Sequence, residues 1–395
     1  MRLFALRQPL LHSFQTSSHR KSGIEHVLVE LTDADGGIGW GEIASPSDPF
    51  YCAETTETAW EIATRYLVPV VLGREWSHPS VLEAGWAKVR GNEFAKAGFS
   101  GAAWDLHARR RGLSLAAALG GTRGEVLSGV SLGIESAIDV LLEQIEHQLA
   151  AGYGRVKLKI APGWDVDPVR DVRAAFPGVD VHVDANGAYP RTAETSEVFL
   201  ALDGLGLTMI EQPFGARDFI AHAELQQRIG TPICLDESVV AIEDLETMLR
   251  LDAGRVLNIK VSRMGGLTQA RRAHDLAEQA GVPVWCGGMH EFGIGRATNV
   301  ALSSLPGFSL PSDVSGSDKY YAHDIIDPPV RAVNGMVAVP SGPGIGHRVD
   351  AERIRLQADR TFDSATGITA SGEPAQRSAP QRAATGSFAT IGVDS

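Results

Sequence analysis

A repeat in residues 126–315 constrains the fold of this chain more than any other feature of its sequence. Short apolar runs recur there, and a helical stretch separates each run from the next. The runs span residues 129–133, 155–160, 179–184, 207–211, 232–236, 256–260, 283–287 and 308–311. Alternating β and α units predict a parallel sheet, and eight strands with seven intervening helices predict a closed barrel.

The chain on either side of the repeat has a different sequence pattern. Residues 1–125 begin with an expected hairpin, in which residues 25–31 and 38–42 flank a glycine-rich turn. Strands followed by helices predict an α+β domain. We expect its helices at residues 53–72, 77–95 and 99–111. Residues 363–395 are rich in Ala, Ser, Thr and Gly without a periodic apolar face, which predicts a disordered tail.

Composition excludes several classes of protein. Lys and Arg total 36 against 48 for Asp and Glu, and a net charge of −12 disfavours binding to nucleic acid or to an anionic membrane. No apolar run approaches the ~18 residues of a membrane span, and the N-terminus does not resemble a signal peptide. The three cysteines are odd in number and far apart, which excludes a disulfide framework and favours a cytoplasmic location.

Five ionisable residues end or follow consecutive predicted strands. From the second strand to the sixth they are Lys159, Asp184, Glu211, Asp236 and Lys260. In barrels of this kind, the carboxyl ends of the strands line the active site. Because the second and sixth strands face each other across a ring of eight, the sequence predicts three carboxylates in a row with a lysine at each side.

This arrangement predicts metal-assisted proton transfer. Three converging carboxylates repel one another unless a cation neutralises them, and all-oxygen ligation suits Mg²⁺, which Mn²⁺ can replace. Beside such an ion, a lysine can remove or return the proton alpha to a carboxylate. The lysine must be neutral to act as a base, and burial, the metal and the second ammonium of Lys157 are expected to lower its pKa. Taken singly, Asp184 could be a helix cap and Lys157 a solvated surface residue.

Several motifs resemble those of a known family. Lys157-Leu158-Lys159, Asp184-Ala185-Asn186-Gly187, Ile210-Glu211-Gln212-Pro213, Asp236-Glu237-Ser238 and Asn258-Ile259-Lys260 resemble the muconate-lactonising subgroup of the enolase superfamily. Within it, residues 232–238 and 285–289 resemble o-succinylbenzoate synthases and N-succinylamino acid (N-acylamino acid) racemases. The resemblance implies a (β/α)7β modified TIM barrel over residues 126–315 and an N-terminal α+β capping domain over residues 1–125. It also implies that residues 316–362 pack back on the capping domain, and that the protein is a homo-oligomer.

The resemblance further implies roles for the residues at the strand ends. Asp184, Glu211 and Asp236 are the expected Mg²⁺ ligands, and Lys159 and Lys260 the expected acid/base pair. In the synthase reaction of menaquinone biosynthesis, 2-succinyl-6-hydroxy-2,4-cyclohexadiene-1-carboxylate is dehydrated through an enediolate. Lys159 is then expected to remove the alpha proton and protonate the leaving hydroxyl, with Lys260 acting as a cation. The alternative, racemisation of N-succinylamino acids, uses both lysines as acid and base. Either way the expected substrate is a small succinylated carboxylate.

Six further residues are candidate substrate-binding residues. They are Lys157, Ser131, Asn186, Arg263, Met289 and Glu291. Arg263 matches an arginine of racemase-capable relatives, and its charge is expected to help keep Lys260 deprotonated, although an ordinary loop arginine is the alternative. Ser131 and Asn186 could equally be structural caps.

Two regions depart from the habit of the family. His290 and Phe292 flank Glu291 in the loop after the seventh strand, where the family usually has an apolar residue followed by Glu-Thr-Gly. This difference predicts an altered choice of substrate. Residues 14–22 and 49–51 look like loops that close over the substrate.

Other functions fit the sequence less well. Dipeptide epimerases carry Asp-x-Asp at the eighth strand, whereas this chain has Asp313-Val314-Ser315. Muconate cycloisomerisation is a weaker alternative, because residues 285–289 favour the enzymes that act on succinylated substrates. A Schiff-base aldolase leaves the three carboxylates unexplained. A purely binding or structural barrel would not need all five ionisable positions filled.

Overall fold

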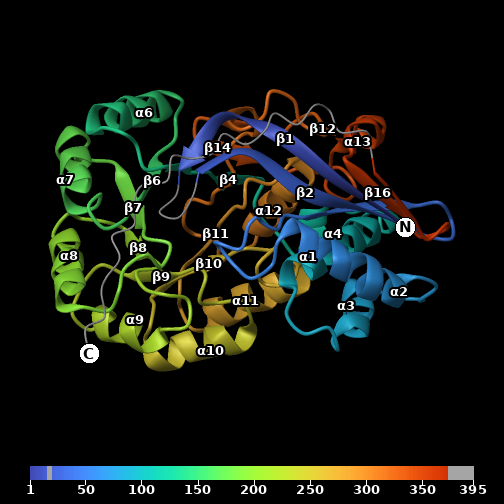
Figure 1. Cartoon of the computed structure of the whole chain (residues 1–395), viewed down its shortest axis with the longest axis horizontal. Coiled ribbons are helices and arrows are strands. Elements are labelled where there is room, and N and C mark those ends of the chain that lie inside the picture. The colour runs from blue at the N-terminus through green and yellow to red at the C-terminus, as the bar shows by residue number, and fades with distance from the viewer. Residues whose placement is uncertain (16–19, 372–395) are drawn as a thin grey trace, which may run out of the picture.

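Two domains lie side by side in the computed structural model, which describes residues 1–15 and 20–371. Figure 1 shows the antiparallel capping sheet and its helices at one end of the molecule, and the barrel with its outer helices at the other. The last described residues return to the capping sheet beside the N-terminus, so that both ends of the described chain lie in the capping domain.

The capping sheet contains five antiparallel strands in the order β17-β16-β1-β2-β3. They are β1 (Arg2–Gln15), β2 (Arg20–Thr32), β3 (Ile38–Ile43), β16 (Arg360–Asp363) and β17 (Ile368–Ser371). β2 and β3 form the predicted hairpin, and Asp33 fixes its turn because Oδ1 accepts the N–H of Gly37 at 2.7 Å. Of the predicted loop at residues 14–22, residues 14–15 and 20–22 are instead strand ends, and residues 16–19 lie outside the described residues.

The predicted disordered tail is wrong for residues 363–371. Arg360 to Asp363 pair with the edge strand β1, and Ile368 to Ser371 pair in turn with β16. Arg2 Nε donates to Asp363 Oδ2 at 3.0 Å and ties the two ends of the domain together. The pairing rests on main-chain hydrogen bonds to an open sheet edge, which leave no apolar periodicity in the sequence. Residues 372–395, the rest of the predicted tail, lie outside the described residues.

The capping helices differ from expectation mainly in where one of them begins. They are α1 (Thr56–Ile62), a π-helical turn (Ala63–Leu67), α2 (Val68–Val71), α3 (Pro79–Glu83), a 3₁₀ turn (Ala84–Trp86) and α4 (Glu93–Arg110). The predicted division between residues 77–95 and 99–111 is wrong. The break comes earlier, at Gly91 and Asn92, whose φ angles of 60° and 59° are left-handed and end a helical run.

Seven parallel strands form the barrel sheet, in the order β11-β10-β9-β8-β7-β6-β5. They are β5 (Val130–Leu132), β6 (Arg155–Lys159), β7 (Asp180–Asp184), β8 (Met209–Glu211), β9 (Ile233–Leu235), β10 (Val256–Ile259) and β11 (Val284–Cys286). The helices are α6 (Ile138–Ala150), α7 (Val166–Ala175), α8 (Ala193–Asp203), α9 (Phe219–Gln226), α10 (Ile242–Leu251), α11 (Leu267–Gln279) and α12 (Gly293–Ser303). This architecture confirms the predicted (β/α)7β modified TIM barrel with an N-terminal α+β capping domain.

The eighth predicted strand is reduced to a closing segment. Phe308 makes an isolated parallel bridge with Val284 of β11, and Ser312 makes another with Ser128, just before β5. Pro311 lies between these bridges and has no N–H to donate, which prevents a continuous ladder. The segment therefore joins the first and last strands and closes the ring through these two bridges and a hydrogen bond from the Asp313 N–H to Cys286 O at 2.8 Å.

Short elements link the two domains. They are α5 (Leu115–Leu119), β4 (Glu125–Leu127), a 3₁₀ turn (Ser317–Lys319), β12 (Ile326–Asp327), β13 (Ala332–Val333), β14 (Met336–Ala338), β15 (Arg348–Val349) and α13 (Ala351–Gln357). β14 pairs with β4, and the N–H of Asp359, which follows α13, donates to Ala5 O of β1 at 2.9 Å. Through these elements the chain returns from the barrel to the capping sheet.

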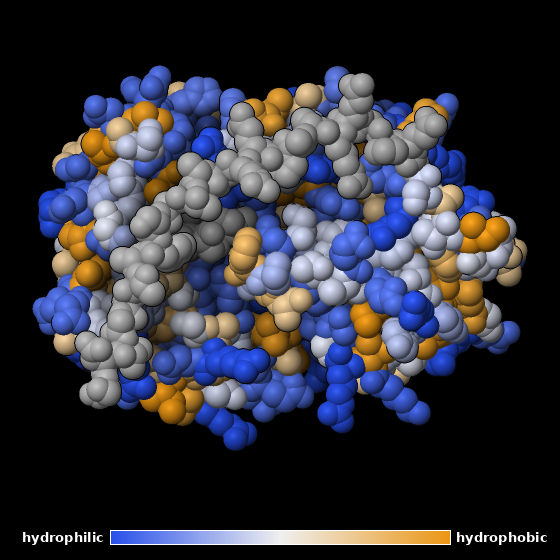
Figure 2. All heavy atoms as spheres, in the orientation of Figure 1, coloured by the Kyte–Doolittle hydropathy of each residue, from blue (hydrophilic) through white to orange (hydrophobic). Residues whose placement is uncertain are grey.

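The outside of the molecule is largely polar on the face drawn in Figure 2, where hydrophobic side chains form small separate groups. Scattered exposed apolar residues of this kind are normal for a folded surface. Among the described residues, no helix combines the length and the apolar character that a membrane crossing requires.

Helix α4 and strand β3 meet through glycines. A Cβ added at Gly41 would overlap the carbonyl oxygen of Gly98 and lie 2.7 Å from the backbone nitrogen of Ala102. Both of these obstacles are backbone atoms of α4, which cannot move aside without shifting the helix. The next residue, Glu42, accepts the N–H of Phe292 in the barrel domain. The close contact at Gly41 therefore also helps to position the capping sheet relative to the barrel.

We therefore expect Gly41→Ala to lower the free energy of unfolding by ~1–3 kcal/mol through overpacking. Gly124→Ala is the matched control, because no atom lies within 4 Å of its added Cβ, and we expect a change within about 0.5 kcal/mol. Thermal and urea unfolding of both variants measure the difference. Equal stability of the two variants would contradict this packing.

Candidate active site

The five predicted strand-end residues lie next to one another. Lys159, Asp184 and Glu211 are direct register partners on β6, β7 and β8. Asp236 follows β9 and Lys260 follows β10, each by one residue. The exposed fractions of these five residues are only 8%, 1%, 0%, 1% and 6% in chain order. The ends of the parallel strands thus form a buried row of three carboxylates between two lysines.

The turns after these strands adopt conformations that most residues avoid. Asn186 and Gln212 have φ angles of 45° and 42°, and His290, after β11, has a φ of 62°. Left-handed backbone at residues other than glycine is a sign of strain, and such strain gathers at functional sites. Asp184 stabilises the first of these turns, because its Oδ1 accepts the N–H of Asn186 at 2.9 Å.

Each carboxylate of the row is paired with a lysine. Lys159 Nζ lies 2.5 Å from Asp184 Oδ2, Lys260 Nζ lies 2.7 Å from Asp236 Oδ2, and Lys157 Nζ lies 3.1 Å from Glu211 Oε2. Lys159 also donates to the side-chain oxygen of Asn186 at 2.8 Å. The lysines thus lie on both sides of the row, as the order of the strands predicts.

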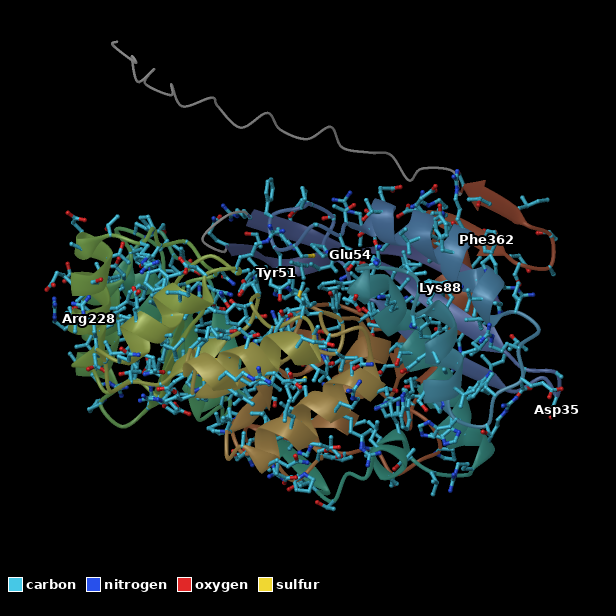
Figure 3. All side chains as sticks on the ribbon, turned by 90° about the horizontal axis from the view of Figure 1, so that it is seen from below. Asp35, Tyr51, Glu54, Lys88, Arg228 and Phe362 are labelled. Atoms are coloured by element: carbon cyan, nitrogen blue, oxygen red, sulfur yellow. The ribbon has the colours of Figure 1, made fainter. Side chains whose placement is uncertain are left out.

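Two further groups converge on Asp236. The Arg263 guanidinium contacts Asp236 Oδ1, and the Tyr51 hydroxyl donates to the same oxygen at 2.7 Å. Lys260 Nζ donates to the Tyr51 hydroxyl at 3.2 Å and lies 4.6 Å from the centre of its ring. Tyr51 belongs to the capping domain, and Figure 3 shows it at the junction with the barrel. The sequence indicated the loop of Tyr51, but not that its hydroxyl reaches the carboxylate row.

Sequence reasoning also missed two amides that hold the carboxylates in place. Asn258 Nδ2 donates to Glu211 Oε1 at 2.7 Å. Its position two residues before Lys260 was a usable signal, because side chains two apart in a strand share one face. The Gln212 side-chain oxygen accepts the N–H of Asp236 at 3.0 Å, and its nitrogen donates to Ser238 Oγ at 2.7 Å. These contacts join neighbouring strand ends into one network.

The pKa values of the carboxyl groups in the row are shifted in different directions. Although burial raises the pKa values of Asp184 and Asp236, the ammoniums of Lys159 and Lys260 outweigh it and hold both values below the usual range. Burial and the neighbouring Asp184 raise the pKa of Glu211 well above its usual value. Burial and Asp236 raise the pKa of Glu237 to about 7. The site therefore favours an additional positive charge.

The donor set fits a hard divalent cation. As the side chains stand, no three acidic, histidine or cysteine residues in the described ranges are arranged as a metal site. Lysines contact the three carboxylates instead. Oδ2 of Asp236 nevertheless accepts no hydrogen bond, although Lys260 lies beside it. Buried carboxylate oxygens from adjacent strand ends are the ligand type that Mg²⁺ and Mn²⁺ prefer.

The expected lowering of a lysine pKa is not found at Lys260 in this arrangement. Burial lowers the pKa of Lys260, but the Asp236 carboxylate more than compensates and raises it well above its usual value. Burial likewise lowers the pKa of Lys157, but the carboxylates of Asp313 and Glu211 outweigh burial, so that the pKa is raised. Lys157 Nζ lies 3.0 Å from Asp313 Oδ2, so that protein carboxylates surround it.

The remaining predicted residues lie at the rim of this cluster. Ser131 Oγ donates to Asp313 Oδ2 at 3.1 Å, and Met289 packs against the core of the capping domain. The Glu291 carboxylate accepts a hydrogen bond from Asn299 of α12 at 2.9 Å, which points to a structural rather than a substrate contact. Among the described residues, neither Met289 nor Glu291 makes a hydrogen bond or an ion pair with the three carboxylates.

The capping sheet is hydrogen-bonded to the loop after β11. Glu42 of β3 accepts the N–H groups of Phe292 and Gly295, at 2.8 Å and 2.7 Å, at the start of α12. His26 Nδ1 lies 2.6 Å from the same carboxylate, and its ring packs 5.1 Å from that of Phe292. A carboxylate at a helix N-terminus is favourable, and here it fixes the second domain against the barrel. Phe292 thus belongs to the domain junction.

The chain is similar to known proteins over both of its domains. Residues 140–353 match the family model "Enolase C-terminal domain-like", and residues 2–120 match "Mandelate racemase / muconate lactonizing enzyme, N-terminal domain". An o-succinylbenzoate synthase of Geobacillus kaustophilus is 47% identical over 88% of this chain and 92% of its own length. An N-succinylamino acid racemase of Amycolatopsis is 44% identical over 86% and 92%.

A solved structure gives the same result for the fold. An enolase superfamily member from Listeria innocua superposes with a TM-score of 0.88 and 36% identity, over 91% of this chain and 96% of that one. Both domains are thus covered by one family. The chain belongs to the enolase superfamily, in its mandelate racemase and muconate-lactonizing enzyme subgroup.

Proposed function

We propose that this chain dehydrates 2-succinyl-6-hydroxy-2,4-cyclohexadiene-1-carboxylate to o-succinylbenzoate, a step of menaquinone biosynthesis. The observation that carries the proposal is the row of three buried carboxylates flanked by Lys159 and Lys260. The 47% identity to an o-succinylbenzoate synthase supports the same reaction. Membership of the enolase superfamily implies a divalent metal, typically Mg²⁺, and Asp184, Glu211 and Asp236 are the proposed ligands.

In this proposal Lys159 moves the proton. A divalent ion at the carboxylate row would supply the positive charge that favours a second negative charge on the substrate carboxylate. Asp184 and Asn186 hold Lys159 Nζ at one side of the row. The neutral amine takes the proton from the carbon alpha to the carboxylate, and the C–H electron pair passes into the enediolate. The ammonium then returns this proton to the leaving hydroxyl as the C–O bond breaks, so that water is released.

Lys260 acts as a cation on the opposite side. Three strands separate β6 from β10 in the sheet, which places Lys260 across the mouth from Lys159. Its contacts with Asp236 and Tyr51 fix the ammonium, and the Asp236 carboxylate favours its charged state. A fixed positive charge there stabilises the enediolate without reorganising as the reaction proceeds.

Racemisation of N-succinylamino acids is the second candidate function, and one contact favours it. Arg263 shares the Asp236 carboxylate with Lys260. Its guanidinium lowers the pKa of Lys260, so that it partly opposes the effect of Asp236 and favours proton exchange. With Lys159 on the other side, each lysine could serve one enantiomer. The 44% identity to an N-succinylamino acid racemase supports this activity.

The finer expectations of the sequence stay predictions. They are the choice of Mg²⁺ over Mn²⁺, substrate contacts by Ser131 and Asn186, assembly into a homo-oligomer, and a cytoplasmic location. The surroundings of Lys157 favour a role in neutralising Glu211 and Asp313 over a direct contact with the substrate.

We expect Lys159→Ala to lower dehydration and racemisation at least ~10²–10⁴-fold, because the proton acceptor is lost. Lys260→Arg should abolish racemisation but leave part of the dehydration, because arginine keeps the charge and does not release its proton. The decrease in cyclohexadiene absorbance and the change in optical rotation of N-succinylphenylalanine measure the two reactions. Lys88→Ala, an exposed lysine of the capping domain, is the control (Figure 3). Wild-type turnover by Lys159→Ala would refute the mechanism.

Removal of the divalent ion should abolish both activities. We expect dialysis against EDTA to lower turnover below detection and Mg²⁺ to restore it, with Mn²⁺ as a partial substitute. Asp236→Asn should prevent this recovery while far-ultraviolet circular dichroism shows an intact fold. Full turnover in excess EDTA, from protein shown to be metal-free by elemental analysis, would be incompatible with the proposal.

A further inference from the structure

Most cationic side chains around the barrel mouth already have a partner. Arg155 and Lys157 contact Asp313, and Arg263 contacts Asp236. Arg296 donates to the main-chain oxygens of Glu291 and Ser315, and Lys319 donates to that of Ser131. Each of these cations is thus committed to a protein group and is poorly placed to bind a separate anion.

Lys21, at the start of β2 in the capping domain, is different. Among the described residues, no carboxylate lies within ion-pair distance of its ammonium, and its side chain is half-buried. Burial lowers the pKa of Lys21, nearby Asp48 raises it, and the ammoniums of Lys260 and Lys159 lower it further. Lys21 therefore brings an unpaired positive charge close to the two lysines of the barrel.

The pairing of β1 with β2 shows which way Lys21 faces. Lys21 lies directly opposite Phe14, and opposed residues of an antiparallel pair share one face. The Phe14 ring packs edge-on against His290, with 4.8 Å between ring centres. Next to it, Gln15 O accepts the N–H of Ile134 at 3.2 Å. This end of the ribbon therefore rests on the loops after β5 and β11, and Lys21 faces the mouth of the barrel.

His290 completes the surroundings of this lysine. Its ring lies between the rings of Phe14 and Tyr320, at 4.8 Å and 5.2 Å, and makes no hydrogen bond with any described residue. Burial and then the Lys21 ammonium hold the pKa of His290 well below its usual value. A neutral imidazole keeps one N–H donor. Among the described residues, the Lys21 ammonium and the His290 imidazole therefore lack an ion-pair or hydrogen-bond partner, and both lie where the β1–β2 ribbon rests on the barrel loops.

We propose that Lys21 binds the second carboxylate of the substrate, at the end of the succinyl group, with the His290 imidazole as a hydrogen-bond donor beside it. The inference rests on the proposed function, in which the other carboxylate of the substrate lies at the row of Asp184, Glu211 and Asp236. Charge-assisted hydrogen bonds are about twice as strong as neutral ones. Lys21 is thus a specificity-determining residue that favours dicarboxylates over monocarboxylates of the same shape.

Two ligands that differ only in the terminal carboxylate measure the contribution of the proposed Lys21 contact to binding. The product o-succinylbenzoate carries the terminal carboxylate, and 2-butanoylbenzoate has a methyl group in its place. We would measure both dissociation constants by isothermal titration calorimetry with the full chain and saturating Mg²⁺. The wild type should bind o-succinylbenzoate at least about tenfold more tightly. Lys21→Gln should remove most of this preference and leave the affinity for 2-butanoylbenzoate within about twofold.

Two matched variants control for other effects of the substitution. Lys88→Gln removes an exposed capping-domain charge away from the junction with the barrel, and should keep the wild-type preference (Figure 3). Lys21→Arg keeps the charge and should retain most of the preference. His290→Phe keeps a ring between Phe14 and Tyr320 but no N–H, and should reduce the preference less than Lys21→Gln does.

The inference is overturned if the wild type binds the two ligands equally or binds neither. It is also overturned if Lys21→Gln keeps the wild-type preference, or weakens both ligands alike, which would indicate a role in shaping the capping domain. The proposed function is tested separately, by turnover of the cyclohexadiene substrate. Because the ratio of dissociation constants needs no turnover, failure of the reaction and failure of this contact are distinguishable.

Discussion

Neutralisation of three buried carboxylates is the constraint on which the rest of this structure depends. Asp184, Glu211 and Asp236 are almost completely removed from water, and a buried charge is costly unless it is paired. Lysines from the barrel strands surround the row, yet burial and the neighbouring Asp184 raise the pKa of Glu211 well above its usual value. The protein's own cations thus leave the row short of positive charge. The same shortage that would destabilise an ordinary core makes this one suited to a divalent ion, whose charge would in turn stabilise a substrate that gains negative charge.

The capping domain takes part in the site instead of merely covering it. Tyr51 donates to Asp236 from a capping loop, and Glu42 fixes the start of α12. Lys21 faces the same mouth from the end of the β1–β2 ribbon. In the proposed mechanism the barrel supplies the groups that move protons, whereas the capping domain supplies Tyr51 and Lys21, whose positions depend on how the two domains meet.

The sequence predicted the barrel and its row of charged residues because both follow from a simple spacing. Apolar runs at a regular interval give strands, and residues at the ends of parallel strands must meet at one edge. Three features lay beyond this reasoning. The pairing of residues 363–371 depends on main-chain hydrogen bonds, which apolar periodicity does not report. The Tyr51 contact depends on a loop of one domain reaching the other. The raised pKa of Lys260 depends on its distance from Asp236, which no spacing along the chain encodes.

The most direct test of the account is a crystal structure of the full chain with Mg²⁺ and o-succinylbenzoate. The account predicts that the ion replaces the lysines at Asp184, Glu211 and Asp236, and that the ring carboxylate of the product lies beside it. Lys159 and Lys260 should then lie on opposite faces of the product ring. A complex in which both lysines keep their present partners and the product binds elsewhere, or in which both lie on one face of the ring, would contradict the account.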